Sequence, residues 1–187
     1  MARMKPPHVP EAPPTVLTEE QLRRLLKVCE GKGLLAKRDS ALLRLLLHTG
    51  MWRAELSILR VEDIDFEQNI ALVVGKGRRP RGCPFGRRTA GELDRYLRER
   101  AKHRDADRPD LWLGMAGPLT PKGVHQLVRD RARQASLGKV WPHIFRHSYA
   151  HQWLAIGSCL LLKPCAVPQL YKVLAELGIP PAAGRAH

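Results

Sequence analysis

The sequence predicts a mixed α+β domain that is mostly α-helical and carries a small antiparallel sheet beside the helices. Leucine-rich segments with helical spacing, several bounded by helix-capping residues, indicate the helices. A β-branched run followed by a glycine-rich turn indicates the sheet. With 187 residues, of which 44% are hydrophobic, the chain is large enough to bury the core of one domain of ordinary size.

Three helices are predicted in the first part of the chain. Thr18 is a favourable N-cap and Gln21 stands where a capping box requires it, so the first helix is expected to begin here. A second, leucine-rich helix is expected over residues 38–48, with Gly50 ending it. A short third helix is expected over residues 53–59.

A β-hairpin is predicted next. Residues 70–74 are apolar and rich in β-branched side chains, and the Gly-Lys-Gly turn over residues 75–77 follows them. The second strand contains prolines, which donate no backbone hydrogen bond, so this strand is expected at the edge of the sheet. Six basic residues lie between positions 76 and 88, which makes the hairpin strongly cationic.

The second half of the chain is expected to be helical, with one further short strand. Helices are expected over residues 89–102, 121–135 and 142–156, and a strand over residues 111–113. Thr120 is a good N-cap for the middle one of these helices. That helix and the last one each carry a proline in the first turn, where no N–H group is needed.

Three regions are expected along the chain. Residues 1–15 contain five prolines and few apolar side chains, which is typical of a linker or of the remnant of one. Residues 16–157 are expected to form the domain. Residues 158–187 carry four charged side chains, a far lower density than the preceding part, and are interpreted as a divergent C-terminal tail.

The chain is strongly basic, with a formal net charge of +14, and such a field attracts polyanions. Nucleic acid is the first expected partner and an anionic membrane surface is the second. No apolar run approaches the roughly 20 residues that a membrane span requires. The start of the chain does not have the pattern of a secretory signal, and the four scattered cysteines indicate free thiols in a reducing cytoplasm.

Three residues are candidates for binding a single anion. His143 and Arg146 are three positions apart on a predicted helix, which places both side chains on one face. Lys76, on a glycine-flanked turn, can approach the same anion from another direction. Each residue alone has a simpler interpretation, the lysine as a solvated turn residue and the other two as ordinary side chains near a helix start.

Together with neighbouring motifs, these residues make the chain resemble the tyrosine recombinases, also called the phage integrase family. The matching pieces occur in family order at residues 49–56, 61–65, 75–79, 119–124 and 142–147. Any one piece is weak, but five pieces in order are specific. The resemblance covers roughly residues 15–157 and implies the fold of the family's catalytic domain, a helical domain with a small antiparallel sheet or hairpin.

The resemblance also implies a chemistry without a metal ion or other cofactor. In this family a tyrosine attacks the scissile phosphate and forms a 3′-phosphotyrosyl bond, which conserves the phosphodiester energy for rejoining. Two arginines and a His or Trp hold the phosphate oxygens, a hairpin lysine protonates the leaving oxygen, and a histidine assists proton transfer. Carried over to this chain, the lysine is Lys76, the histidine is His143 and the second arginine is Arg146.

The first arginine motif departs from the family pattern. Trp52 occupies the position of the arginine, and Arg53 follows one residue late. One residue is about 100° of helix rotation, so Arg53 is expected to point elsewhere unless the turn is remodelled. Loss of a transition-state arginine typically costs on the order of 10³–10⁵ in rate. Trp52 is therefore interpreted as a space-filling substitution, with Arg53 as a candidate replacement.

The tail departs from the family pattern as well. The positions at which the family carries its last His or Trp and its nucleophilic tyrosine fall on Gln169 and Gly178, and neither supports the chemistry. Tyr171 is the one tyrosine of the tail, either a displaced nucleophile or an ordinary amphipathic residue. We therefore expect catalysis to be impaired, and the sequence leaves open whether this copy is still an enzyme.

Basic residues on and after the hairpin are candidates for contacts with DNA phosphates. They are Arg78, Arg79, Arg81 and Lys122. Each such contact adds about one unit to the salt dependence of binding, although the same residues can equally form a solvated face. The spacing of His143, His147 and His151 also permits a zinc site, but the resemblance accounts for the His-Arg-His run without metal, and no metal site is expected.

The expected function is that of a DNA-binding site-specific tyrosine recombinase or integrase, which cleaves and rejoins DNA strands in DNA integration and recombination. The expected partners are double-stranded DNA and a second recombinase protomer in a synaptic complex, without membrane binding. The expected location is the nucleoid in the cytoplasm. Two alternatives remain, a non-enzymatic DNA-binding integrase relic and a basic RNA-associated module.

Overall fold

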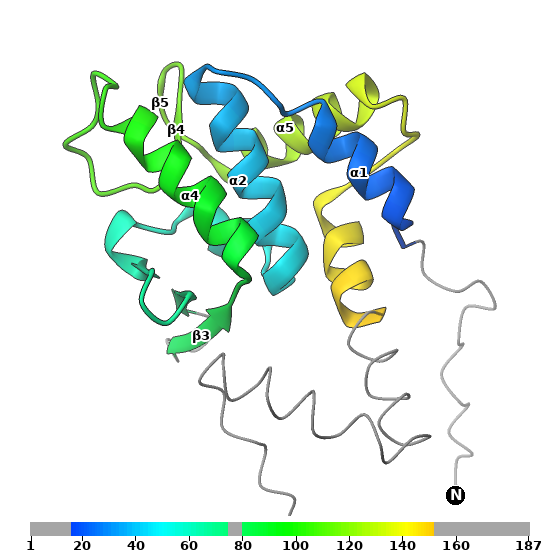
Figure 1. The fold of residues 1–187 in the computed structure, drawn as a ribbon, viewed down its shortest axis with the longest axis horizontal. Helices are drawn as coiled ribbons and strands as arrows, with labels where there is room; N and C mark the ends of the chain where they lie inside the picture. The colour runs from blue at the N-terminus through cyan, green and yellow to red at the C-terminus, as the bar shows by residue number, and fades with distance from the viewer. Residues whose placement is uncertain (1–15, 75–79, 152–187) are drawn as a thin grey trace, which may run out of the picture.

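Figure 1 shows the computed structural model of the chain, in which residues 16–74 and 80–151 are described. Its helices include α1 (Glu19–Lys27), α2 (Leu34–Thr49), α3 (Arg53–Ser57), α4 (Arg87–Arg100) and α5 (Pro121–Gln134). The strands are β1 (Ile64–Asp65), which follows a 3-10 turn η1 (Val61–Asp63), β2 (Ile70–Val74), β3 (Pro80–Pro84), β4 (Leu113–Gly114) and β5 (Gly117–Pro118). A further helix, here called the last helix, covers residues 142–151. The mostly helical fold with small antiparallel sheets confirms the predicted fold class.

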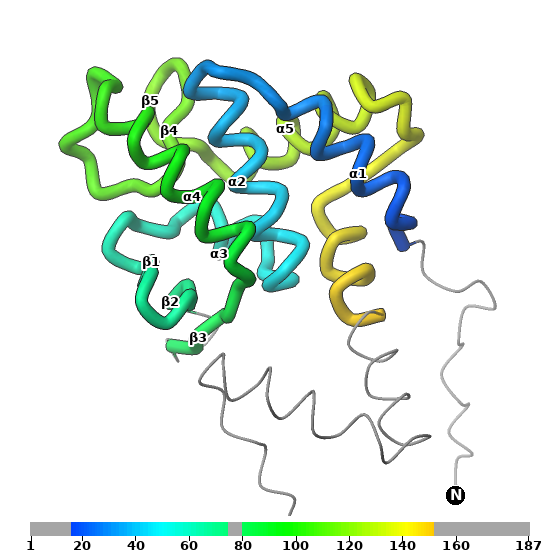
Figure 2. The backbone as a smooth tube through the Cα atoms, in the orientation of Figure 1, coloured from blue at the N-terminus to red at the C-terminus, as the bar shows by residue number. Residues whose placement is uncertain are grey.

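Helix α2 is at the centre of the core. Its leucines at positions 42, 43, 45 and 46 have no exposed surface, because this helix is apolar on more than one side. Helix α4 packs along α2, α1 also contacts α2, and α5 contacts both α1 and α3 (Figure 2). The sheet of β1, β2 and β3 lies at one end of this helical layer, next to α3.

Side-chain caps set two of the predicted helix starts. At α1, Thr18 Oγ1 accepts the Gln21 N–H at 3.2 Å, and Gln21 Oε1 accepts the Thr18 N–H at 2.9 Å. At α5, Thr120 Oγ1 accepts the Gly123 N–H at 3.1 Å. Both predicted starts are confirmed, because each cap pairs N–H groups that a helix leaves without an internal partner.

Helix α2 begins at Leu34, earlier than the predicted start at residue 38. Arg38 and Asp39 are buried within it, and their side chains pair at 2.7 Å. Asp39 also pairs with Arg131 of α5 at 2.7 Å. The charged residues at the expected start of this helix therefore lie inside the domain as a paired cluster, which is how buried charges are tolerated.

The predicted hairpin is confirmed. Strand β2 lies between β1 and β3, all antiparallel, with Ala71 opposite Cys83 and Val73 opposite Arg81. The side chains of β2 alternate between the buried and the exposed face, as expected for a sheet with one solvated side. Strand β3, with a proline at each end, occupies the predicted edge. The turn over residues 75–79 lies outside the described residues.

The strand predicted over residues 111–113 is shorter in the structure, where β4 begins at Leu113. Before β4, the Leu111 N–H donates to the Leu59 carbonyl at 2.8 Å, and a tyrosine side chain also holds this segment. The Tyr96 hydroxyl donates to the Leu111 carbonyl and accepts the Leu113 N–H, both at 2.9 Å. The Tyr96 ring also stacks on Trp112, with 5.4 Å between ring centroids. Isolated backbone hydrogen bonds and a side chain of α4 therefore hold this segment, which forms no continuous strand.

The last helix packs on the domain through one face only. Phe145 is buried there, and Ser148 Oγ accepts the backbone N–H of Leu17 at 2.9 Å. The opposite face exposes His143 and Arg146, as their spacing predicted. The predicted end of this helix lies outside the described residues.

Gly50 ends α2 in the predicted left-handed conformation, with φ of 55°. A Cβ atom here would lie 2.6 Å from Cδ1 of Tyr149 on the last helix. Gly50→Ala therefore combines backbone strain with a clash against an aromatic ring. We expect this change to lower the free energy of unfolding by about 1–3 kcal/mol, measured by urea denaturation followed by circular dichroism.

Gly91→Ala is the matched control for this substitution. Gly91 lies inside α4, and a Cβ atom there meets nothing within 4 Å. Because alanine is the better helix former, the same replacement should raise the free energy of unfolding by about 0.5–1 kcal/mol. Effects of the same sign at both positions would contradict the special role of the Gly50 conformation.

Candidate functional site

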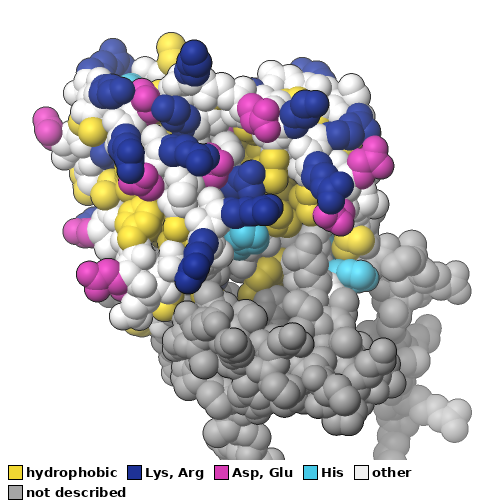
Figure 3. All heavy atoms as spheres, in the orientation of Figure 1, with side chains coloured by type: hydrophobic (Ala, Val, Ile, Leu, Met, Phe, Trp, Pro, Cys, Tyr) yellow, Lys and Arg dark blue, Asp and Glu magenta, His cyan; other side chains and the backbone are white. Residues whose placement is uncertain are grey.

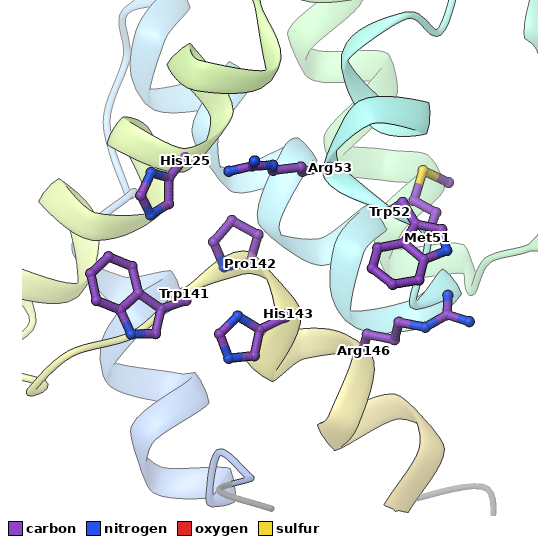
Figure 4. Close-up of a pocket in the computed structure, with 8 residues that line it drawn as sticks. All are labelled: Met51, Trp52, Arg53, His125, Trp141, Pro142, His143 and Arg146. Carbon is purple, nitrogen blue, oxygen red and sulfur yellow. The ribbon is translucent and has the colours of Figure 1, made fainter.

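A pocket of about 430 Å³ opens where three segments meet. Its walls come from the start of α3, from α5 and from the start of the last helix (Figure 4). The lining residues are Met51, Trp52, Arg53, His125, Trp141, Pro142, His143 and Arg146. Folding therefore brings together His143 and Arg146, which are two of the three residues predicted to bind one anion. Positions 52 and 53, where the sequence differs from the family pattern, lie in the same pocket.

The guanidinium group of Arg146 is held in place by the end of α2. Its Nη1 donates to the Gly50 carbonyl at 2.8 Å, and its Cζ lies 4.6 Å from the centroid of the Trp52 ring. The carbonyl belongs to the left-handed turn that ends α2, and the indole supplies a cation–π contact. Arg146 is thus oriented by two contacts while its side chain stays exposed.

Trp52 is the residue just before α3, and 55% of its surface is exposed. Its backbone N–H donates to Glu55 Oε2 at 2.8 Å, which pairs one of the free N–H groups at the start of the helix. The backbone is therefore fixed, whereas the indole is directed outward into the pocket beside Arg146 (Figure 4). The tryptophan is accommodated without being buried in the core.

Arg53 is a second cation of this pocket. It is the first residue of α3, and its exposed side chain extends toward His125, away from the guanidinium of Arg146 (Figure 4). Among the described residues it has no hydrogen-bond or ion-pair partner. The sequence predicted that Arg53 points elsewhere unless the turn is remodelled. The turn into α3 leaves it on the pocket wall, although on a different side from Arg146.

Rings form much of the remaining wall. The exposed His143 meets His147 edge-on, with ring centroids 5.8 Å apart. His125 of α5 stacks on Trp141 with centroids 5.1 Å apart. Sequence reasoning missed His125 and Trp141, although each lies directly beside one of the family-like motifs. In the described part of the chain, no group of three or more His, Cys, Asp or Glu side chains could hold a metal ion.

Arg81 of β3 is bound to Glu55 of α3. Its guanidinium donates two hydrogen bonds, 2.9 and 2.7 Å long, to the two carboxylate oxygens. Partial burial raises the pKa of Glu55, but the hydrogen bonds from Arg81 and Trp52 and the charges of Arg81 and Arg146 outweigh it. The pKa of Glu55 therefore lies below its ordinary value of 4.5. This pair connects the edge of the sheet to the helix that carries Arg53.

The sequence profile of the phage integrase family matches residues 15–158. The chain belongs to this family. Its pocket at the start of α3 and of the last helix is formed by the motif segments that carry the resemblance.

The similar proteins are recombinases of this integrase family. Tyrosine recombinase XerC of Bacillus pumilus is 34% identical over 154 residues, which are 79% of this chain and 50% of that protein. The crystal structure of XerA recombinase matches with a TM-score of 0.71 and 28% identity, covering 82% of this chain and 54% of that one. XerH site-specific recombinase bound to difH substrate gives a TM-score of 0.62 and 25% identity, covering 73% of this chain and 42% of that one. This integrase-family chain thus spans about half the length of the curated relatives it matches.

The structure describes only some of the other predicted site residues. Lys122 is exposed in the first turn of α5, and Arg81 is engaged by Glu55. Four predicted residues lie outside the described residues, and their roles stay predictions. They are Lys76, Arg78, Arg79 and Tyr171. Across residues 16–74 and 80–151, no helix has the length and apolar character to cross a membrane.

Arg81→Ala tests the link between the sheet and α3. Because the pair is partly exposed, with 43% of the Arg81 side chain accessible, we expect a loss of about 0.5–1 kcal/mol in the free energy of unfolding at pH 7. The pKa of Glu55 is lowered in the folded state, so this contribution is present above about pH 4.5 and is lost as the pH falls through the lowered value. Denaturation at several pH values measures the difference between the two proteins.

Arg60→Ala is the control for the Arg81 substitution. Arg60 pairs with Glu62 on the surface, where both side chains are mostly exposed, so its removal should have little effect at any pH. A difference between wild type and Arg81→Ala that does not shrink below pH 4.5 would show that Glu55 is not the group responsible.

Proposed function

We propose that this chain binds duplex DNA as the catalytic domain of a site-specific tyrosine recombinase, and that its strand cleavage is impaired. The observation that supports DNA binding is the convergence of Arg53, His143 and Arg146 on one pocket, with all three side chains exposed. Guanidinium and imidazole N–H groups donate to phosphate oxygens, so this arrangement suits a DNA phosphate.

The charge of the whole chain supports the same substrate. The net charge is +14, and Lys and Arg side chains are spread over the face shown in Figure 3. Residues of this kind displace counterions from DNA, so binding of this type weakens as salt increases. The similar recombinase XerH was crystallised with its difH substrate, which is consistent with a DNA ligand for the matching domain.

The proposed roles follow the chemistry of the family. Arg146 and His143 hold the oxygens of the scissile phosphate, His143 also transfers a proton, and Arg53 approaches the same phosphate from another wall. Lys76 protonates the leaving oxygen, and Tyr171 is the candidate nucleophile. Attack by the tyrosyl oxygen forms the 3′-phosphotyrosyl bond and breaks the bond to the 5′ oxygen, which leaves as a hydroxyl group.

The proposed impairment has a structural and a sequence basis. The indole of Trp52 offers one neutral N–H donor. The arginine that the family has at this position offers a charged guanidinium group with several N–H donors. Arg146 already donates to the Gly50 carbonyl, so its remaining N–H groups must stabilise the charge of the transition state. Gln169 and Gly178 stand where the family has its last imidazole or indole and its tyrosine. A DNA-binding integrase relic is therefore the nearest alternative.

We also propose a setting for this domain. Its substrate would be chromosomal or element DNA at the nucleoid, and its partner a second recombinase protomer in a synaptic complex. Membership of the integrase family and the basic surface support both proposals. A stronger affinity for structured RNA than for duplex DNA would instead favour the RNA-associated alternative.

DNA binding is tested with the full chain and a fluorescent duplex, by anisotropy at several salt concentrations. The affinity should fall steeply with salt. Arg146→Ala should weaken binding several-fold, and the slope of log affinity against log salt should decrease by about one unit. Arg98→Ala is the control, because Arg98 is an exposed arginine of α4 that pairs with Asp94 and does not line the pocket. Equal losses in the two variants would contradict a phosphate site at Arg146.

Strand cleavage is tested with a suicide substrate, a duplex nicked close to the scissile phosphate so that a cleaved strand cannot rejoin. We expect little or no covalent protein–DNA adduct on a denaturing gel, because the first arginine is replaced and the tail lacks the family pattern. Rapid and complete adduct formation would contradict the proposed impairment. Loss of that adduct in Tyr171→Phe would then assign the nucleophile to Tyr171.

A further inference from the structure

We propose that the pocket at the start of α3 accepts an unpaired nucleotide, whose base stacks on the ring walls while its phosphate is held by the arginines. This inference rests on the proposed DNA-binding function and names the form of DNA that the site prefers. A phosphate site needs donors and charge. This pocket has both, and it has in addition the rings of Trp52, His125 and Trp141, to which the proposed cleavage chemistry gives no role.

The first observation is the ring content of the pocket. Four of its lining residues, Trp52, His125, Trp141 and His143, carry planar rings. Its volume of about 430 Å³ is in the range of sites for small organic ligands and far exceeds the size of a phosphate group. A nucleobase fills such a space with its faces against the rings, and this stacking tolerates any base because every base has a π face.

The second observation is the exposure of Trp52. Large aromatic side chains are usually buried, yet 55% of the surface of Trp52 is exposed although Arg146 covers part of its ring. The guanidinium of Arg146 and the uncovered part of the indole therefore lie side by side. A nucleotide presents the matching pair of groups, a planar base next to an anionic phosphate.

The third observation is Arg53. Its side chain lies on the wall toward His125, and the described residues provide it with neither a hydrogen-bond acceptor nor a carboxylate. Arg53 and Arg146 thus approach the pocket from different sides, with His125 and Trp141 toward Arg53 and Trp52 beside Arg146 (Figure 4). The phosphate of a nucleotide in this pocket can therefore receive N–H donors from both sides.

A paired base inside a duplex cannot reach these rings, because its faces are covered by its neighbours. Taking a base out of the stack costs least when it is already unpaired. The pocket should therefore distinguish an unpaired nucleotide from a paired one. The preference should come from the base itself, since the phosphates are present in both kinds of DNA.

The experiment compares three labelled duplexes by fluorescence anisotropy with the full chain. The first is fully matched, the second carries one unpaired adenosine, and the third carries an abasic nucleotide at the same bulge. We expect the adenosine bulge to bind about ten-fold more tightly than the abasic bulge, which has the same number of phosphates. The ratio of these two affinities measures the contribution of the base.

Substitution of the exposed indole tests where the base stacks. Trp52→Ala should bring the ratio close to one, and Trp52→Phe should keep a substantial part of the preference because it retains a ring. Phe66→Ala is the control, since Phe66 is an exposed aromatic residue on the turn after β1 and does not line the pocket. It should retain the full ratio. Circular dichroism checks that the variants are folded.

Two outcomes overturn the inference without affecting the proposed function. Equal affinities for the adenosine and the abasic bulge would show that any preference arises from bending and not from the base. An unchanged ratio in Trp52→Ala would place the base elsewhere. Absence of salt-dependent binding to all three duplexes would instead contradict DNA binding itself, and so the proposed function.

Discussion

The left-handed turn at Gly50 is the constraint on which the pocket depends. It ends the central helix, and it presents the carbonyl that accepts a hydrogen bond from Arg146 at 2.8 Å. It also allows the ring of Tyr149 on the last helix to approach the chain at a place where a Cβ atom would collide with it. The next residues, Trp52 and Arg53, then enter α3 at the pocket wall. One backbone conformation therefore ends the central helix, admits the ring of the last helix and orients Arg146.

Much of the fold was predictable where a local signal decides the structure. Thr18 and Thr120 cap their helices through side chains that lie three residues from their partners, and such contacts are encoded in the sequence itself. The hairpin followed in the same way from residue type and turn chemistry. The prediction of element boundaries was less accurate where the local structure contacts a residue that is distant in the sequence. Asp39 within α2 pairs with the distant Arg131, and the backbone before β4 is bonded by the hydroxyl of Tyr96. Neither contact leaves a trace in the local pattern.

The site residues show the same difference between local contacts, which were predictable, and distant contacts, which were not. His143 and Arg146 lie one helical turn apart, so their shared face was predictable from spacing. The position of Arg53 was not, because it depends on how the chain leaves the turn after α2 rather than on an ideal helical rotation. The stacking of His125 on Trp141 joins two elements that are separate in sequence. Contacts of this kind become visible only when the three walls of the pocket are assembled.

The hydrogen bond between Leu17 and Ser148 has a consequence for the architecture of larger proteins built on this domain. It places the first described segment against the last helix, so the two ends of the described part lie close together. Domains with neighbouring ends tolerate insertion into other proteins and circular permutation. Joining the two ends and opening the chain at the exposed turn over residues 66–68 would interrupt none of the three segments that form the pocket. A chain permuted in this way would keep all three walls of the pocket continuous in sequence.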